Sequence, residues 1–388
     1  MTSSSKLRKI AGALLLVFLV LLLAALTAVR IQRTQTAEES LPEGAGTPTA
    51  AAEEAPASPE AVSAPETTPE PTPEPTPEPT PEPTPEPTLP PLRELSLCTD
   101  NLDENLFSPA EHRGTVEVVQ YKTRDYQSGS PDEIEKDLAV YLPWGYDENK
   151  EYDVLMLLHC AGADHRFWLL KPREYRTEDD VIPVSVPNML DRMFEEGWCR
   201  PLIVIAPCIY LIDHQPHWTG NSYDYTQFMH EVGNDLLPYV AEHYATYASD
   251  GSREALRAAR EHFGVLGASF GAYAGYLSVI ADNYDLAAWY TFCGGGEIDP
   301  GYLMNGWTNT GTQDLPLKLL YLSMGEYDDC MAAQRSVYNL KYCGGPFTED
   351  NILFTMITGW GHEDHSYLCG LFNSLQLFFR DENPLTTS

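Results

Sequence analysis

The sequence predicts an α/β fold in which a mostly parallel sheet is covered by helices on both faces. Three observations support this fold class. Continuous apolar runs, typical of strands buried on both faces, alternate with helical patterns along the C-terminal three quarters of the chain. A Gly-x-Ser-x-Gly turn joins one such strand to a helix, and groups capable of proton transfer follow two later strands. Because function in such folds gathers at the carboxyl ends of the strands, these turns are expected to meet there.

The first 33 residues predict a membrane anchor or signal segment. Lys6, Arg8 and Lys9 precede an apolar run over residues 10–29. A run of about 20 residues spans roughly 30 Å, enough to cross the hydrocarbon core of a bilayer. It is longer than the core of a usual signal peptide, so an uncleaved helix is favoured over a removed signal. The basic flank keeps the N-terminus in the cytoplasm and places the C-terminal part of the chain outside the cell, either anchored or secreted.

Residues 34–92 predict a disordered spacer. The unit Pro-Glu-Pro-Thr occurs five times from Pro69 to Thr88. Proline at every second position removes backbone donors and fixes φ, so neither a helix nor a sheet ladder forms. Such a segment extends by about 3.1 Å per residue and separates two parts of a protein. Residues 93–388 then form one folded domain, long enough for a large core.

Charge and cysteine content restrict the partners. The formal net charge is −33, and because 12 acidic and 5 basic residues precede Arg93, a charge of −26 belongs to the folded domain. This excludes nucleic acid as a partner and favours a neutral polysaccharide or a small uncharged ester as substrate.

Eight cysteines without a Cys-x-x-Cys pair predict neither a zinc cluster nor another cofactor. Cys160, Cys208 and Cys293 follow apolar strands and are interpreted as buried thiols. One or two disulfides among the others stay open, and the sequence does not pair them.

The elements of the domain follow from hydrophobic periodicity. Strands are expected at residues 115–121, 138–142, 154–158, 202–206, 265–266, 287–292, 319–322 and 352–357. Helices are expected at residues 186–196, 226–245, 272–281, 332–342 and 365–379.

The turn Gly267-Ala268-Ser269-Phe270-Gly271 is the strongest chemical signal. It has the pattern of a nucleophile elbow, in which a sharp strand-to-helix turn exposes a serine hydroxyl. Glycine is needed on both sides because strand and helix pack too closely for a Cβ atom. The helix that follows directs backbone N–H groups toward developing negative charge. Ser269 is therefore the predicted nucleophile.

An acid and a base follow Ser269 along the chain. Asp328 comes after the strand at 319–322, and His362 comes after the strand at 352–357. The order nucleophile, acid, histidine is that of the α/β-hydrolases, so this fold is predicted. His362 would take the proton of Ser269, and Asp328 would orient the imidazole. Asp329 and His365 are the neighbouring alternatives, although His365 is expected in the next helix.

The remaining site residues are predicted from their place in this fold. Backbone N–H groups of Ala161, after the strand at 154–158, and of Phe270 would form the oxyanion hole. Aromatic residues near the predicted cleft include Trp168, and Trp218 and Trp360 are expected to bind substrate by stacking.

The motifs together resemble carbohydrate esterase family one, within the esterase D superfamily, which includes feruloyl and acetylxylan esterases. The resemblance covers residues 115–379. It is carried by Gly145-Tyr146-Asp147, the loop at 157–162, the helix end at 236–240, the elbow, Gly325-x-x-Asp328 and Gly361-His362. The chain departs from the family's His-Gly-x-Gly loop because Cys160 and Ala161 follow His159, and Phe270 replaces the frequent methionine after the serine.

The resemblance implies a serine esterase that deacylates feruloyl or acetyl xylan through an acyl-Ser269 intermediate. It also favours Asp328 over Asp329. Alternatives are an acyltransferase or a siderophore or lipid esterase of the same superfamily, and a catalytically silent module that binds glycan.

Overall fold

The computed structural model describes residues 90–176, 181–211, 223–295, 301, 303–304, 307 and 311–385. The predicted anchor at residues 10–29 lies outside them, as does nearly all of the predicted spacer. Among the residues that are described, no helix combines the length and apolar character needed to cross a membrane.

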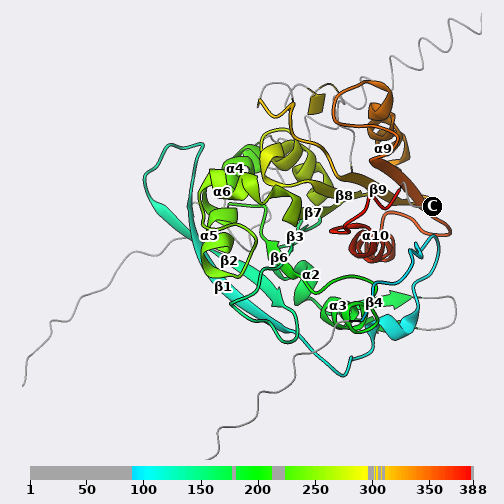
Figure 1. The fold of residues 1–388 in the computed structure, drawn as a ribbon. Helices are drawn as coiled ribbons and strands as arrows, with labels where there is room; N and C mark the ends of the chain where they lie inside the picture. Colours follow the sequence, from blue (N-terminus) through cyan, green and yellow to red (C-terminus); the bar gives the residue numbers. More distant parts are fainter. Residues whose placement is uncertain are drawn as a thin grey trace, which may run out of the picture. The chain divides into compact units, whose positions relative to one another are not determined.

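A mixed, mostly parallel sheet is the centre of the described domain (Figure 1). Its strands lie in the order β1-β2-β6-β3-β7-β8-β9-β10. The pairs β1–β2 and β2–β6 are antiparallel, and every later pair is parallel. The strands are β1 Thr115–Arg124, β2 Glu133–Leu142, β3 Val154–Leu158, β6 Ile203–Pro207, β7 Phe263–Ala268, β8 Trp289–Cys293, β9 Leu319–Gly325 and β10 Ile352–Ile357. The predicted α/β-hydrolase fold is confirmed for this domain.

Helices cover both faces of the sheet, as the apolar strands require. On β3, Val154, Met156 and Leu158 face one buried layer while Leu155 and Leu157 face the other. The first layer includes α4 Tyr223–Glu231, α5 Leu237–His243, α6 Arg253–Ala258, α7 Phe270–Ala274 and α9 Met331–Tyr338. The second includes α2 Arg166–Leu169, α3 Val186–Glu195 and α10 Asp364–Leu377.

Two predicted helices are wound differently from a regular α-helix. The helix expected at 226–245 is split by a π-helical turn, η2 Val232–Leu236, and the helix after the elbow continues as a second one, η4 Gly275–Ile280. Short 3₁₀ turns complete the fold at η1 Glu104–Phe107, η3 Arg260–His262, η5 Tyr284–Leu286 and η6 Asn339–Tyr342. A small separate hairpin, β4 Arg173–Arg176 with β5 Val181–Val184, was not predicted.

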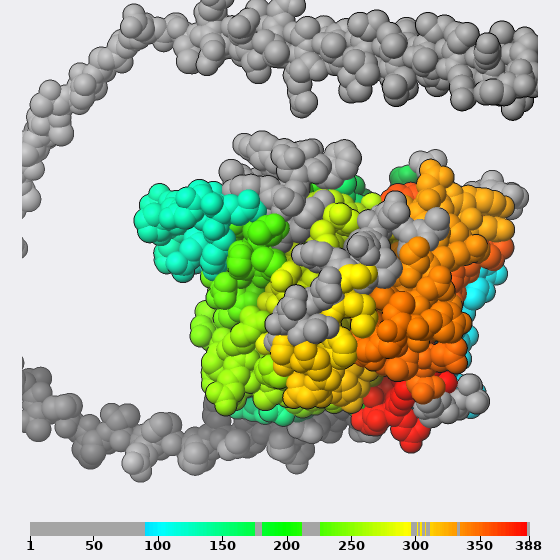
Figure 2. Space-filling model, turned by 90° about the horizontal axis from the view of Figure 1, so that it is seen from above, coloured from blue at the N-terminus to red at the C-terminus, as the bar shows by residue number. Residues whose placement is uncertain are grey.

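One buried ion pair joins the sheet to the first helical layer. Lys136 of β2 and Glu231 of α4 are at most 1% exposed, and the Lys136 Nζ lies 2.5 Å from Glu231 Oε1. Lys136 also donates to the carbonyl of Cys208 at 2.8 Å, and the hydroxyl of Tyr121 donates to Glu231. Burial raises the pKa of Glu231, against the lowering effect of Lys136. Away from this pair, the tip of the β1–β2 hairpin projects from the body of the domain (Figure 2).

Candidate active site

Ser269 lies in a sharp turn between the end of β7 and the start of α7. Its φ is 54° and its ψ is −115°, and together with Phe379 it is one of two non-glycine residues with positive φ in the described chain. Such a backbone is strained, and the surrounding structure must hold it. The N–H of Ser269 donates to the carbonyl of Cys293 on β8 at 2.8 Å, which fixes the turn to the neighbouring strand.

The glycines of the elbow are needed for the close packing around Ser269. A Cβ at Gly271 would lie 2.4 Å from the carbonyl oxygen of Leu158, at the end of β3. A Cβ at Gly267 would lie 2.3 Å from the carbonyl oxygen of Gly271. Both separations are far shorter than real Cβ contacts, so the predicted reason for glycine at these positions holds.

The structure brings Ser269, His362 and Asp328 into one hydrogen-bonded chain. Nε2 of His362 lies 2.8 Å from Oγ of Ser269, and its Nδ1 lies 2.9 Å from Oδ2 of Asp328. With the proton on Nδ1, the ring donates to Asp328 and accepts the hydroxyl of Ser269. The three residues follow β7, β9 and β10, whose carboxyl ends lie at one edge of the parallel sheet.

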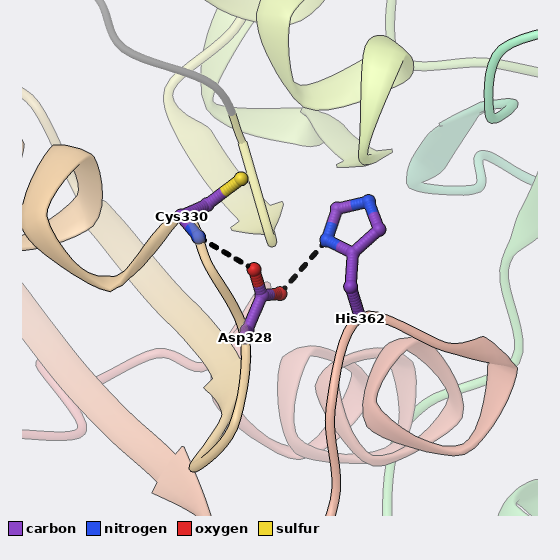
Figure 3. A group of neighbouring side chains, drawn as sticks. All are labelled: Asp328, Cys330 and His362. Atoms are coloured by element: carbon purple, nitrogen blue, oxygen red, sulfur yellow. Dashed lines mark hydrogen bonds and ion pairs between the residues drawn. The ribbon is translucent and has the colours of Figure 1, made fainter. Parts of the chain in front are cut away.

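Asp328 is held as a buried carboxylate. Its side chain is fully buried, whereas that of His362 is 39% exposed. Burial alone would raise the pKa of Asp328, but the hydrogen bonds from His362 and from the N–H of Cys330 lower it below its usual value. Figure 3 shows Asp328 between Cys330 and His362, with the Cys330 N–H 2.8 Å from Oδ1.

The same hydrogen bond shifts the pKa of His362. Donation to Asp328 raises the pKa of His362 above its usual 6.5, although burial opposes the shift. Within the described residues, Asp328, Cys330 and His362 also form the group whose ligand atoms lie within 4.8 Å of one another and so could hold a metal ion. Two of these three residues already pair with each other.

The two alternative residues lie elsewhere. Asp329 is exposed. His365 is buried in α10, and its Nε2 lies 2.7 Å from the carbonyl oxygen of Asp100, to which it donates. Burial lowers the pKa of His365. The geometry therefore favours Asp328 and His362, which form the hydrogen-bonded chain with Ser269.

The predicted oxyanion loop follows β3 and is held by side chains. Nε2 of His159 accepts the N–H of Ile209 at 2.9 Å, so Nδ1 carries the proton and donates to the carbonyl of Cys160 at 2.8 Å. The N–H of Gly162 donates to the hydroxyl of Tyr210 at 2.9 Å. Ala161, between these anchors, is exposed. The loop is therefore fixed on both sides of Ala161, although its role as a donor stays a prediction.

Phe270, the other predicted oxyanion donor, begins α7 next to Ser269, and its ring stacks on Tyr210 with ring centroids 5.5 Å apart. The ring of Phe270 thus contacts the same tyrosine that holds Gly162.

Cys160 is partly buried, not fully buried as expected, and burial raises the pKa of its thiol to about 12.

The aromatic residues noted near the predicted cleft lie in different environments. Trp168, noted near the predicted cleft, is 1% exposed in the second helical layer, and its Nε1 donates to the carbonyl of Leu158 at 3.0 Å, so it packs in the core. Trp360 is half-buried beside the base; its Nε1 donates to Asn101 and its ring lies 3.9 Å from that of His365. Trp218 lies outside the described residues. Substrate binding by Trp218 and Trp360 stays a prediction.

Tyr367 contacts the site but was not predicted. It is buried in α10, and its ring lies edge-on to that of His362, with the ring centroids 5.6 Å apart. Burial raises the pKa of Tyr367, so its hydroxyl stays protonated. Its position five residues after His362, in a predicted helix, was the one available signal. The contacts that Tyr210 and Cys330 make with residues of the site were not predicted either.

The comparisons with known proteins concern this fold. The chain matches no protein-family model. It is similar to endo-1,4-beta-xylanase Y of Acetivibrio thermocellus, with 30% identity over 138 residues. The match covers 35% of this chain and only 11% of that protein, so the chain spans a small part of this relative's length.

Solved structures extend the similarity to about three quarters of the chain. The feruloyl esterase module from Clostridium thermocellum, in a mutant complexed with sinapinate, has a TM-score of 0.60 at 20% identity. It matches 75% of this chain and 97% of the module. The chain has the fold of the feruloyl esterases.

A second structure agrees with this. The CE1 ferulic acid esterase from Anaeromyces mucronatus has a TM-score of 0.55 at 18% identity, covering 74% of this chain and 98% of that esterase. The resemblance to carbohydrate esterase family one that the motifs predict is thus confirmed at the level of the fold.

Proposed function

We propose that this chain is a carboxylic ester hydrolase that uses Ser269 as nucleophile and acts on acyl esters of plant cell-wall polysaccharide, such as feruloyl or acetyl xylan. The observation that carries the proposal is the continuous hydrogen-bonded chain Ser269–His362–Asp328 at the carboxyl edge of the sheet. The similarity to feruloyl esterase structures and to a xylanase supports the substrate class.

In the proposed mechanism, His362 Nε2 takes the proton of Ser269 while Oγ attacks the ester carbonyl. Asp328, which stays ionised because its pKa is lowered, stabilises the imidazolium that forms. The N–H groups of Ala161 and Phe270 receive the oxyanion. His362 then donates its proton to the leaving alcohol of the polysaccharide. Water, deprotonated by the same ring, releases the acid from the acyl-Ser269 intermediate.

Location is part of the proposal. Residues 10–29 would anchor the protein in the cell membrane, and residues 34–92 would hold the domain of residues 93–388 away from it, outside the cell. The apolar run and the Pro-Glu-Pro-Thr repeats support this arrangement. Fractionated cells should contain the protein in the membrane pellet, and protease added to intact cells should release the catalytic domain. A full-length protein that resists protease in intact cells would contradict the location.

Activity-based labelling tests the catalytic proposal. The full chain should react with a fluorophosphonate at Ser269 and hydrolyse aryl acetates and methyl ferulate. The variant Ser269→Ala should lose both, with kcat reduced on the order of 10⁶-fold. Ser249→Ala, which removes an exposed hydroxyl, is the matched control. A parent protein left unlabelled, with no hydrolysis across acetyl, feruloyl and longer acyl esters, would point to a silent glycan-binding module instead.

A further inference from the structure

The chain enters the catalytic domain through an extended segment, residues 93–101, that lies along α10; we call it the entry segment. Oε1 of Gln376 accepts the N–H of Ser96 at 2.9 Å, and Nε2 of Gln376 donates to the carbonyl of Ser96 at 3.1 Å. Asn373, one turn earlier in α10, binds both backbone groups of Cys98 in the same way, at 2.7 Å and 2.9 Å. Two amide side chains of the helix therefore fix the backbone of the entry segment.

These contacts place two thiols against each other. Sγ of Cys98 lies 3.3 Å from Sγ of Cys369, although 271 positions separate them in the sequence. Both are buried. Cys369 lies on α10 one turn before Asn373, so one helix holds the backbone of Cys98 and carries its sulfur partner. The hydrogen bond with Cys369 also lowers the pKa of Cys98, which favours a thiolate there.

We propose that Cys98 and Cys369 are a disulfide site. The reaction needs an external disulfide as oxidant, such as oxidised glutathione or the active disulfide of a thiol oxidoreductase. The Cys98 thiolate attacks one sulfur of that disulfide and releases a thiolate. The Cys369 thiolate then attacks the Cys98 sulfur and releases the second one. The two protein thiols lose two protons and two electrons, and the oxidant gains them as two thiols. The sulfur atoms approach from 3.3 Å to about 2.05 Å.

The cross-link would secure the part of the chain that carries the base. The carbonyl of Thr99 accepts the N–H of Thr358 at 2.7 Å, just after β10. The carbonyl of Asp100 accepts from His365 at the start of α10. The loop between these two contacts holds His362, so the entry segment supports this loop from outside. A disulfide also restricts the unfolded chain, and more so when it closes a loop as long as this one.

Peptide mapping under controlled redox conditions tests the proposal. The full chain is equilibrated with a buffer of oxidised and reduced glutathione, both as the folded protein and during refolding from urea, so that burial of the thiols does not prevent exchange. Free thiols are then alkylated, and the digest is mapped without reduction. We expect a cross-linked pair of peptides containing Cys98 and Cys369, an intact mass lower by two hydrogens, and a melting temperature several degrees above that of the reduced protein.

Single variants separate the outcomes. Cys98→Ser and Cys369→Ser should each abolish the cross-link and the rise in melting temperature, while Cys343→Ser, which removes an exposed thiol, should retain both. Circular dichroism checks that each variant folds. The proposal would be overturned if Cys98 and Cys369 were recovered from the folded parent, after equilibration with oxidised glutathione, in alkylated form or only as mixed disulfides with glutathione. None of these readouts depends on ester hydrolysis, so the two proposals fail independently.

Discussion

The imidazole of His362 reaches the hydroxyl of Ser269 at 2.8 Å across 93 positions of the sequence, because β7 and β10 end at the same edge of the sheet. Each partner of this contact is placed by a different loop. The catalytic assignments can therefore be tested one residue at a time.

Replacing the buried acid should separate it from its exposed neighbour. Asp328→Asn keeps the shape but reverses the hydrogen-bond preference toward Nδ1 of His362, so we expect kcat to fall on the order of 10⁴-fold. Asp329→Asn, its exposed neighbour, should keep kcat close to that of the parent. Steady-state hydrolysis of an aryl acetate measures both. Equal losses in the two variants would mean that Asp328 is not the orienting acid.

The midpoint of the acid limb of the pH profile should lie at a higher pH than the usual pKa of histidine. His362 must be neutral to accept the proton of Ser269, and its pKa is raised by the hydrogen bond to Asp328. Activity is therefore lost as the pH falls through this raised pKa, and the midpoint of log kcat/KM should lie above pH 6.5. The residual activity of Asp328→Asn should show a midpoint at lower pH than the parent. An unchanged midpoint would be evidence that another group controls the limb.

The packing of the elbow should not tolerate one methyl group. In Gly271→Ala the new Cβ would meet the carbonyl oxygens of Leu158 and His159 at 2.4 Å and 2.7 Å, so the β3 loop or the elbow must move. We expect a lower melting temperature and a fall in kcat. Gly361→Ala is the stability control, because its nearest contact is an ordinary 3.6 Å. If both variants melt at the same temperature, the close approach is not a constraint.

The buried ion pair should matter most when only half of it is removed. Lys136→Met leaves Glu231 without its cation in a buried site, and we expect a loss of about 3–5 kcal/mol in the free energy of unfolding. The double variant Lys136→Met with Glu231→Leu should recover much of this loss, since neither charge remains. Urea denaturation of the parent, the two single variants and the double variant measures this. Additive losses in the double variant would argue against coupling.

Strong local patterns made much of the sheet predictable. The strand Val154–Leu158 has the predicted bounds because it is apolar at every position and buried on both faces. The Ser269 turn was recognisable from the sequence because the close packing of its strand and helix requires glycine at positions only a few residues apart. Asp328 and His362 follow strands directly, so the fold alone brings them to the same edge.

Features that depend on distant contacts were not predictable. The π-helical turns η2 and η4 leave no mark in the hydrophobic pattern. Trp168 follows the oxyanion loop, yet the packing of α2 turns it into the core. The contact of Tyr367 with the ring of His362 depends on how α10 crosses the sheet. The contact between Cys98 and Cys369 depends on residues 93–101, where the sequence predicts no helix or strand.

Arg380, just after α10, donates through Nη2 to the carbonyl of Arg93 at 3.1 Å, so the first and last segments of the catalytic domain adjoin. A short peptide would suffice to join them, and new termini could then be opened at the exposed Gly344, in the loop that precedes β10 at the far edge of the sheet. Such a circular permutant would retain every loop of the catalytic edge uncut.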